Sequence, residues 1–146
     1  MNPELQGRAF ASTAPYLVGR EKVREFSRAV LASNPINNDV DAARAAGYAD
    51  VVAPPTFAIV IQQFTLDQLV AEEDSGIDMT HIVHGEQRFS YTRPIVAGDE
   101  LTATLAVTGI KSLGGNAMVT AESTIVDADK EHVVTAISTL VVTGDA

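Results

Sequence analysis

The longest apolar stretch of the chain lies near its middle, and the predicted fold is built around it. Residues Val51–Glu73 read VVAPPTFAIVIQQFTLDQLVAEE, and we predict a helix here whose start is stiffened by Pro54 and Pro55. The apolar run Phe57–Ile61 covers more than half of a helical circumference. A helix that is apolar nearly all round must be buried. Toward Glu73 polar residues become frequent, so the far end is predicted to reach solvent.

The chain before this helix predicts one further long helix. Residues Leu5–Tyr16 are of mixed character and are interpreted as a loop or a short edge strand, with Phe10, Tyr16 and Leu17 as buried contacts. Residues Val18–Ala32 carry apolar side chains three and four positions apart, which indicates an amphipathic helix. The first half of the molecule is therefore predicted to be mainly helical.

Residues Ser33–Ala53 form the least regular segment. The Asn-Pro dipeptide at 34–35 ends the preceding helix, and Asn38 or Asp39 can cap a short helix over Val40–Ala46. A polar excursion of this length inside a compact domain is usually functional or disordered. Its apolar residues favour the ordered alternative.

The hydrophobic period changes from helical spacing to alternation in the second half of the chain. Turn residues at 114–116 and 127–130 separate the last three of four predicted strands. The strands are predicted over His81–Pro94, Leu101–Thr108, Ala117–Val126 and His132–Thr143. Helices followed by a largely antiparallel sheet predict the α+β class, with the apolar helix lying across the sheet.

Composition and charge narrow the function. A chain of 146 residues that is 46% hydrophobic predicts one domain over residues 1–146 with one core. A net charge of −9 argues against nucleic acid and anionic membranes as partners. The lack of cysteine excludes disulfides and thiolate chemistry. With no leader-like start and no apolar run near the roughly 20 residues of a membrane span, we expect a cytoplasmic protein.

The basic residues are unevenly distributed, because half of the ten lie between Arg20 and Arg44. Arg20, Arg24 and Arg28 form a stripe along the first helix. The stripe is interpreted either as a solvated helix face or as a docking patch for the phosphate of a carrier-protein or coenzyme A arm.

Four segments together carry a family pattern: NPINND at 34–39, VAPPTF at 52–57, HGEQRF at 84–89 and RPIVAGD at 93–99. The pattern resembles the MaoC-like, R-specific hydratase and dehydratase branch of the hot-dog fold, in particular the non-catalytic substrate-binding subunits of bacterial (3R)-hydroxyacyl-carrier-protein dehydratases. The resemblance covers about residues 16–142. It implies a curved antiparallel sheet wrapped around one long central helix, an overhang formed by Ser33–Ala53 that closes an acyl tunnel, and side-by-side dimers.

The chain departs from that family at the catalytic motif, which reads Gly-Asp-x-Asn-Pro-aliphatic-His in catalytic members. Residue by residue, the aspartate falls on Ala32 and the histidine on Asn37. Alanine has nothing to ionise, and an amide neither takes nor gives a proton near neutral pH. We therefore expect no catalytic residue of the family in this chain. Asn37 could still hydrogen-bond a thioester carbonyl or a water.

The resemblance implies a substrate-binding wall without cofactor or metal. The residues implied to line it are Asn37, Val52, Ala53, Pro54, Thr56, Phe57, His84 and Gly85.

The predicted strand at 81–94 carries side chains that could replace the missing acid and base. His81 and His84 lie three residues apart and are predicted to point to opposite faces. Glu86 is predicted to share the face of His84, so the two could imitate an acid/base pair. The alternative for His84 is a structural histidine.

Two functional hypotheses follow. The first is an acyl-thioester-binding subunit of a (3R)-hydroxyacyl-ACP or CoA dehydratase in fatty-acid elongation, which relies on a partner that carries the Asp/His dyad. The second is a stand-alone hot-dog homodimer that acts as a thioesterase or an acyl-thioester-binding or regulatory protein. A thioesterase would need a carboxylate near the central helix or overhang, and the candidates are Asp39, Asp50 and Asp67.

Overall fold

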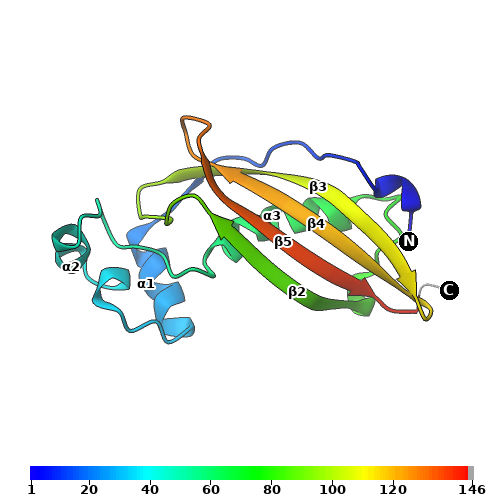
Figure 1. Cartoon of the computed structure of the whole chain (residues 1–146), viewed down its shortest axis with the longest axis horizontal. Helices are drawn as coiled ribbons and strands as arrows, with labels where there is room; N and C mark the ends of the chain where they lie inside the picture. Colours follow the sequence, from blue (N-terminus) through cyan, green and yellow to red (C-terminus); the bar gives the residue numbers. More distant parts are fainter. Residues whose placement is uncertain (145–146) are drawn as a thin grey trace.

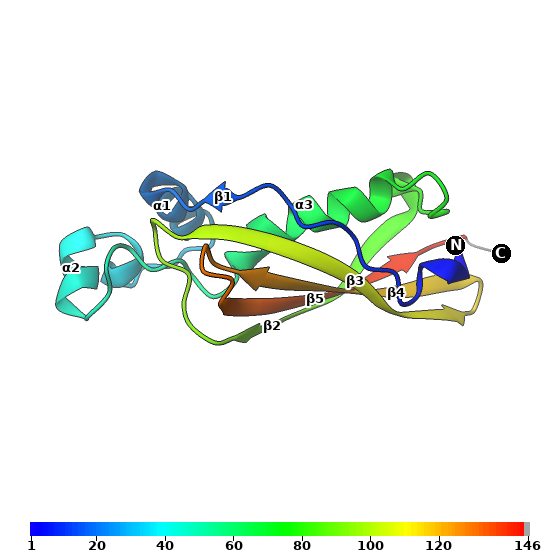
Figure 2. The same cartoon turned by 90° about the horizontal axis from the view of Figure 1, so that it is seen from above.

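A five-stranded antiparallel sheet curves around one long helix in the computed structural model, which describes residues 1–144 (Figures 1 and 2). The strand order is β1-β3-β4-β5-β2, so β2 pairs only with β5 and forms one edge. The strands are β1 (Tyr16–Leu17), β2 (Ile82–Tyr91), β3 (Glu100–Leu113), β4 (Asn116–Val126) and β5 (His132–Val142).

The helices divide between the face of the sheet and one of its ends. Helix α3 lies across the sheet, whereas α1 and α2 lie beyond the end that is opposite the chain termini (Figure 1). The α-helices are α1 (Arg20–Ala29), α2 (Val40–Ala45) and α3 (Ala58–Ala71), and the short 3-10 helices are η1 (Pro3–Leu5), η2 (Pro35–Asn37) and η3 (Met79–His81).

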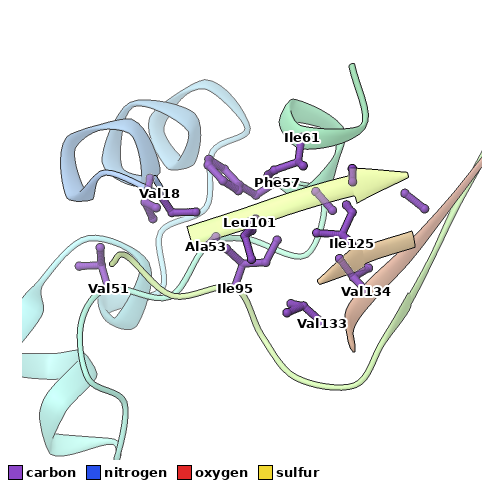
Figure 3. Close-up of a cluster of buried hydrophobic side chains, with 14 residues drawn as sticks. Val18, Val51, Ala53, Phe57, Ile61, Ile95, Leu101, Ile125, Val133 and Val134 are labelled. Atoms are coloured by element: carbon purple, nitrogen blue, oxygen red, sulfur yellow. The ribbon is translucent and has the colours of Figure 1, made fainter. Parts of the chain in front are cut away.

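The core lies between α3 and the inner face of β3, β4 and β5. Phe57 and Ile61 are fully buried against inward-facing side chains of the sheet, including Leu101, Ile125 and Val134 (Figure 3). Burying each such side chain contributes about 1.5–3 kcal/mol. The predicted burial of the first part of the central helix is confirmed for Phe57, Ala58 and Ile61, whereas Ile59 and Val60 are half-buried.

The central helix begins later than the apolar pattern predicts. It starts at Ala58 instead of Val51, because the preceding residues are extended and bonded to other segments. The Val52 amide donates to the Ile36 carbonyl over 2.9 Å, and the Ala53 amide donates to the Ile95 carbonyl over 2.8 Å. These bonds hold the residues before α3 against Ile36 of the overhang and against Ile95, which lies between β2 and β3.

The N-terminal segment runs as an extra edge beside β3, which confirms the edge-strand alternative for its end at Tyr16–Leu17. The prediction that Leu17 is buried was wrong, since 67% of its surface is exposed. Leu5 and Val18 take the buried positions. Strand alternation explains the difference, because adjacent residues point to opposite faces.

The overhang, residues 33–53, is ordered around two short helices. The Asp39 side chain accepts hydrogen bonds from the amides of Asp41 and Ala42 and so caps α2, as predicted. Gly47 follows α2 with a left-handed φ of 96°, a conformation that favours glycine. A curved antiparallel sheet, a central helix and an overhang at one end make up the hot-dog fold that the sequence motifs imply.

Candidate functional site

A cavity of 430 Å³ lies between the overhang, the approach to α3 and the end of β2. Its wall is mostly apolar and comes from segments far apart in the sequence. The lining residues are Asn34, Ile36, Asn37, Tyr48, Val52, Ala53, Pro55, Tyr91, Thr92, Arg93 and Pro94. A concave apolar site with a few polar groups is the usual form of a small-molecule site.

Asn37 is the polar residue whose geometry is most closely fixed in this cavity. Only 8% of its surface is exposed, and its Nδ2 donates to the Val52 carbonyl over 2.6 Å. The backbone carbonyl of Asn37 accepts a hydrogen bond from the buried Ser27 hydroxyl over 3.3 Å. Because an amide nitrogen carries two hydrogens, the second donor of Asn37 remains for a ligand.

Ala32 lies three residues after the end of α1 and five residues before Asn37. Its amide donates to the Ser27 carbonyl over 2.8 Å, and its carbonyl accepts from Asn38 Nδ2 over 3.0 Å. Ser27 therefore contacts both positions that correspond to the family dyad. The Ala32 side chain lines a separate hollow of 370 Å³ together with Arg28 and Leu31, beside the main cavity.

Leu31 stands where the catalytic motif has its glycine and keeps a left-handed backbone, with φ of 58°. That conformation costs about 1 kcal/mol for a residue with a Cβ. Leucine therefore occupies a backbone conformation that favours glycine, the residue of the family motif at this position.

The other polar groups of the wall are engaged within the protein. The Tyr91 hydroxyl donates to the Pro55 carbonyl over 2.5 Å, and burial raises the pKa of Tyr91 to about 12, so it stays protonated. The Arg93 guanidinium bonds Asp99 over 2.8 Å and Asp127 over 3.1 Å. These carboxylates, Asp99 first, raise the pKa of Arg93 above its usual value.

The wall lacks the groups that proton transfer requires. Among its lining residues, all within 1–144, there is no aspartate, glutamate or histidine. General acid–base catalysis by a positioned side chain contributes about 10²–10⁴-fold to a rate. The cavity can therefore bind and orient a ligand, but it supplies neither the acid nor the base of a hydration reaction.

The structure brings only some of the predicted binding residues together. Asn37, Val52 and Ala53 line the cavity, and Pro54 is buried beside them. Thr56 is exposed outside the cavity. Phe57 is fully buried in the core, with its ring edge-on to Phe26 at 5.2 Å between centroids. Its side chain is therefore a packing element and not a wall of this cavity.

His84 and Gly85 lie near the start of β2, whereas the cavity lies at its end, and neither residue lines the cavity. The prediction that Glu86 shares the face of His84 was wrong, because the pairing of β2 with β5 shifts register between the two residues. His84 Nε2 instead bonds Gln87 Oε1 over 3.0 Å, and Glu86 pairs with Arg88 over 3.3 Å. The two residues do not form an acid/base pair.

The predicted set omitted eight of the lining residues, among them Tyr48, Tyr91 and Arg93. Arg93 belongs to the motif at 93–99, and Tyr48 lies within the predicted overhang, so both could have been inferred from the sequence. Tyr91 carries no local signal, because its contact with Pro55 joins residues 36 positions apart.

The carboxylates considered for thioesterase chemistry all have structural partners. Asp39 caps α2, and the exposed Asp67 accepts a hydrogen bond from Gln63 over 2.8 Å. Asp50 bonds Arg20 over 2.7 Å, and this guanidinium lowers the pKa of Asp50 to about 2. None of the three lines the cavity. The positions of these three carboxylates therefore give no support to the thioesterase hypothesis.

The basic stripe of α1 is partly neutralised within the protein. Arg20 pairs with Asp50, while Arg24 pairs with Glu21 and donates to the Asn38 carbonyl over 3.0 Å. Arg24 thereby joins α1 to the overhang. These contacts are structural, which agrees with the interpretation of a largely solvated helix face.

Two searches of the described part of the chain are negative. No group of three or more histidine, cysteine, aspartate or glutamate residues among residues 1–144 is arranged to hold a metal ion. No helix in that range has the length and apolar character needed to cross a bilayer.

Comparison with sequence families identifies relatives of the whole length of the chain. A model of the FAS1-like dehydratase domain region matches residues 4–136. A UPF0336 protein of Clavibacter michiganensis subsp. michiganensis is 68% identical over 145 residues, covering 99% of this chain and 97% of that protein. A UPF0336 protein of Streptomyces avermitilis is 50% identical over 135 residues, covering 92% and 90% of the two chains.

Comparison with solved structures identifies dehydratases that share the fold of this chain. A chain of the C-terminally truncated HadBC (3R-hydroxyacyl-ACP dehydratase) complex of Mycobacterium tuberculosis superposes with a TM-score of 0.86 and 31% identity, covering 94% of this chain and 96% of that one. A MaoC-like dehydratase gives 0.84 and 36%, covering 94% of this chain and 42% of that one. The ChsH1-ChsH2 complex of Mycobacterium tuberculosis gives 0.72 at 17% identity, covering 94% and 97%, and so shares the fold.

Proposed function

The chain belongs to the FAS1-like dehydratase region family of hot-dog proteins, and from this premise we propose that it is the acyl-thioester-binding, non-catalytic subunit of a (3R)-hydroxyacyl-ACP or CoA dehydratase. In this role it binds part of the substrate beside a second hot-dog subunit that carries the Asp/His dyad. The reaction would be the removal or addition of water in fatty-acid elongation.

One observation carries the proposal: among the described residues that line the cavity, none is an aspartate, glutamate or histidine. Asn37 stands at the histidine position and directs its amide to Val52, while Ala32 stands at the aspartate position with a methyl group. A wall of Ile36, Val52, Ala53 and Pro55 suits an acyl thioester, whose carbonyl the second amide hydrogen of Asn37 can bind.

The free edge of β2 supports the existence of a partner. An unpaired strand edge presents a row of backbone donors and acceptors that another strand can use. Strand β2 pairs on one side only, and Val83 on it is 57% exposed. The HadBC neighbour is named as a dehydratase complex, which supports pairing of this chain with a different chain rather than with itself.

Recovery of the native assembly tests the proposed partner. The chain is purified with an affinity tag from the cell in which it naturally occurs, and the intact complex is measured by native mass spectrometry. A mass equal to this chain plus a second hot-dog protein with the Gly-Asp-x-Asn-Pro-aliphatic-His motif is expected. A homodimer with no second chain would support the stand-alone alternative and contradict the proposal.

A further inference from the structure

A second hollow lies along the same seam of the molecule as the candidate site. It has a volume of 220 Å³ and is lined by Gln63, Leu66 and Val70 of α3 together with Ile82, His84 and other residues near β2. The first cavity is lined by Pro55, just before α3, and by Tyr91, at the end of β2. The second hollow therefore lies between α3 and β2, whereas the first lies where the approach to α3 meets the end of β2.

A set of hydrogen-bonded polar side chains separates the two hollows along this seam. Gln62 lies on α3 between Pro55 and Gln63, and Gln87 lies on β2 between His84 and Tyr91. The Gln87 amide donates to Gln62 Oε1 over 2.8 Å and joins the helix to the strand.

The polar set is closed, because its members satisfy one another. The fully buried Gln62 donates from Nε2 to the Ala136 carbonyl over 3.0 Å. Gln87 Oε1 accepts from the buried Ser138 hydroxyl and lies 3.0 Å from His84 Nε2. A buried polar group is costly to leave without a partner, so a closed set of this kind resists being opened.

We propose that Gln62 and Gln87 form a polar stop that ends the acyl-binding path at the middle of the α3–β2 seam and so determines the chain length that this subunit accepts. The inference rests on the proposed function, since it assumes that an acyl thioester occupies the first cavity. Between that cavity and the stop the seam is aromatic, with the rings of Phe89 and Tyr91 6.3 Å apart.

The balance of energies determines whether an alkyl chain passes the stop. Each methylene group that is buried strengthens binding by about fourfold. An alkyl chain that parted Gln62 from Gln87 would leave an acceptor and a donor unpaired, and each such group weakens binding by about 5- to 150-fold. Affinity should therefore rise with chain length until the chain reaches the stop and should then remain level.

The test is the affinity of the full-length chain for trans-2-enoyl-CoA thioesters of increasing length, from crotonyl to hexadecenoyl, measured by isothermal titration calorimetry. The wild-type chain is compared with the double variant Gln62→Leu/Gln87→Leu, which replaces both partners by apolar groups and leaves neither glutamine unpaired. Gln68→Leu is the matched control, because it changes the same residue type on α3 but faces the N-terminal segment.

The expected result for the wild type and for Gln68→Leu is an affinity that rises by about fourfold per methylene and then levels at the same intermediate length. In the double variant the rise should continue to longer chains. A continuous rise to the longest thioester in the wild type would overturn the stop and leave the proposed function standing. Because this profile is read on the wild-type chain, it remains decisive if the double variant does not fold.

Failure of the proposed function gives a different pattern. If no thioester of any length binds the wild-type chain, the assumption of an acyl ligand is overturned, and the stop with it. If the wild type levels off and the folded double variant levels off at the same length, binding stands but the two glutamines do not determine the length, which overturns the inference alone.

Discussion

Asn37 donates its side-chain amide to the backbone carbonyl of Val52 over 2.6 Å, across the mouth of the candidate site. The bond joins the overhang to the approach to α3, and it fixes the amide of the residue that aligns with the histidine of the motif that this sequence resembles. An amide in this place can hold a carbonyl group of a ligand but cannot exchange a proton with it. The same bond therefore stabilises the fold and defines the chemistry of the cavity.

Removal of this bond should lower the stability of the protein. In Asn37→Ala the Val52 carbonyl loses its side-chain donor in a nearly buried position, which should lower the free energy of unfolding by about 1–3 kcal/mol. Urea unfolding followed by circular dichroism measures the change. Ser33 is exposed in the same segment and provides the control, since Ser33→Ala should change stability by less than about 0.5 kcal/mol. Equal stability of Asn37→Ala and the wild type would show that the bond is not a structural support.

Restoration of the dyad should confer activity. In Ala32→Asp/Asn37→His one ring nitrogen of the new histidine can donate to the Val52 carbonyl, as the Asn37 amide does. The other ring nitrogen is then left for proton transfer. Hydration of crotonyl-CoA should become measurable, and each single variant should be slower by about 10²-fold or more. A spectrophotometric assay follows the loss of the enoyl absorbance. The matched control Ser33→Asp/Asn37→His carries the same charges with the carboxylate one position away and should stay inactive.

Phe57 should act as a packing residue. Its ring is fully buried against Phe26, so Phe57→Ala should lower the free energy of unfolding by about 3–5 kcal/mol. The milder Phe57→Leu should fold and should keep the wild-type dependence of thioester affinity on chain length. Thermal unfolding and calorimetry provide the two measurements. A selective loss of affinity for long thioesters in Phe57→Leu would instead place this side chain on the acyl path.

The ion pair of Asp50 and Arg20 predicts a dependence of stability on pH. The pKa of Asp50 is lowered from 3.8 to about 2, chiefly by its hydrogen bond with Arg20. A carboxyl with a lowered pKa in the folded state stabilises the fold above its unfolded pKa, and this contribution is lost as the pH falls through the folded one. Arg20→Gln should therefore be less stable than the wild type above pH 3.8, and the difference should vanish near pH 2.

Acid titration with urea unfolding at each pH measures this difference. Lys22→Gln is the control on the same helix, because Lys22 and Glu25 are exposed and 4.0 Å apart. Exposed pairs of this kind contribute about 0–1 kcal/mol at most. A difference between wild type and Arg20→Gln that persists unchanged below pH 2 would assign the effect to packing of the arginine stem.

The hydrophobic pattern predicted the elements well where one face of each is buried. The alternation in β3 and β4 and the apolar run of α3 each record contact with the core, and the structure places those residues there. The start of α3 could not be predicted this way. Val51 and Val52 are as apolar as the helix itself. They are extended because the Val52 amide donates to the Ile36 carbonyl and the Val51 carbonyl accepts from the Ala97 amide.

The candidate site was predictable only in part, for a related reason. Asn37, Val52 and Ala53 lie in recognisable motifs close together in the sequence. Tyr91 reaches the site by a contact with a residue 36 positions away. The inward position of Gln87 depends on the register shift beside Gly85, which simple alternation along β2 does not predict. Contacts between distant segments and irregular strand pairing therefore account for what the sequence did not reveal.

The most direct test of the central claim is the hydration rate of trans-2-enoyl-CoA by the purified chain, alone and mixed in equal amounts with a dyad-bearing hot-dog partner. The account predicts no turnover above the uncatalysed rate for the chain alone. For the mixture it predicts a rate on long thioesters well above that of the partner alone. Turnover by the chain alone that survives His84→Ala, or a mixture no faster than the partner, would contradict the account.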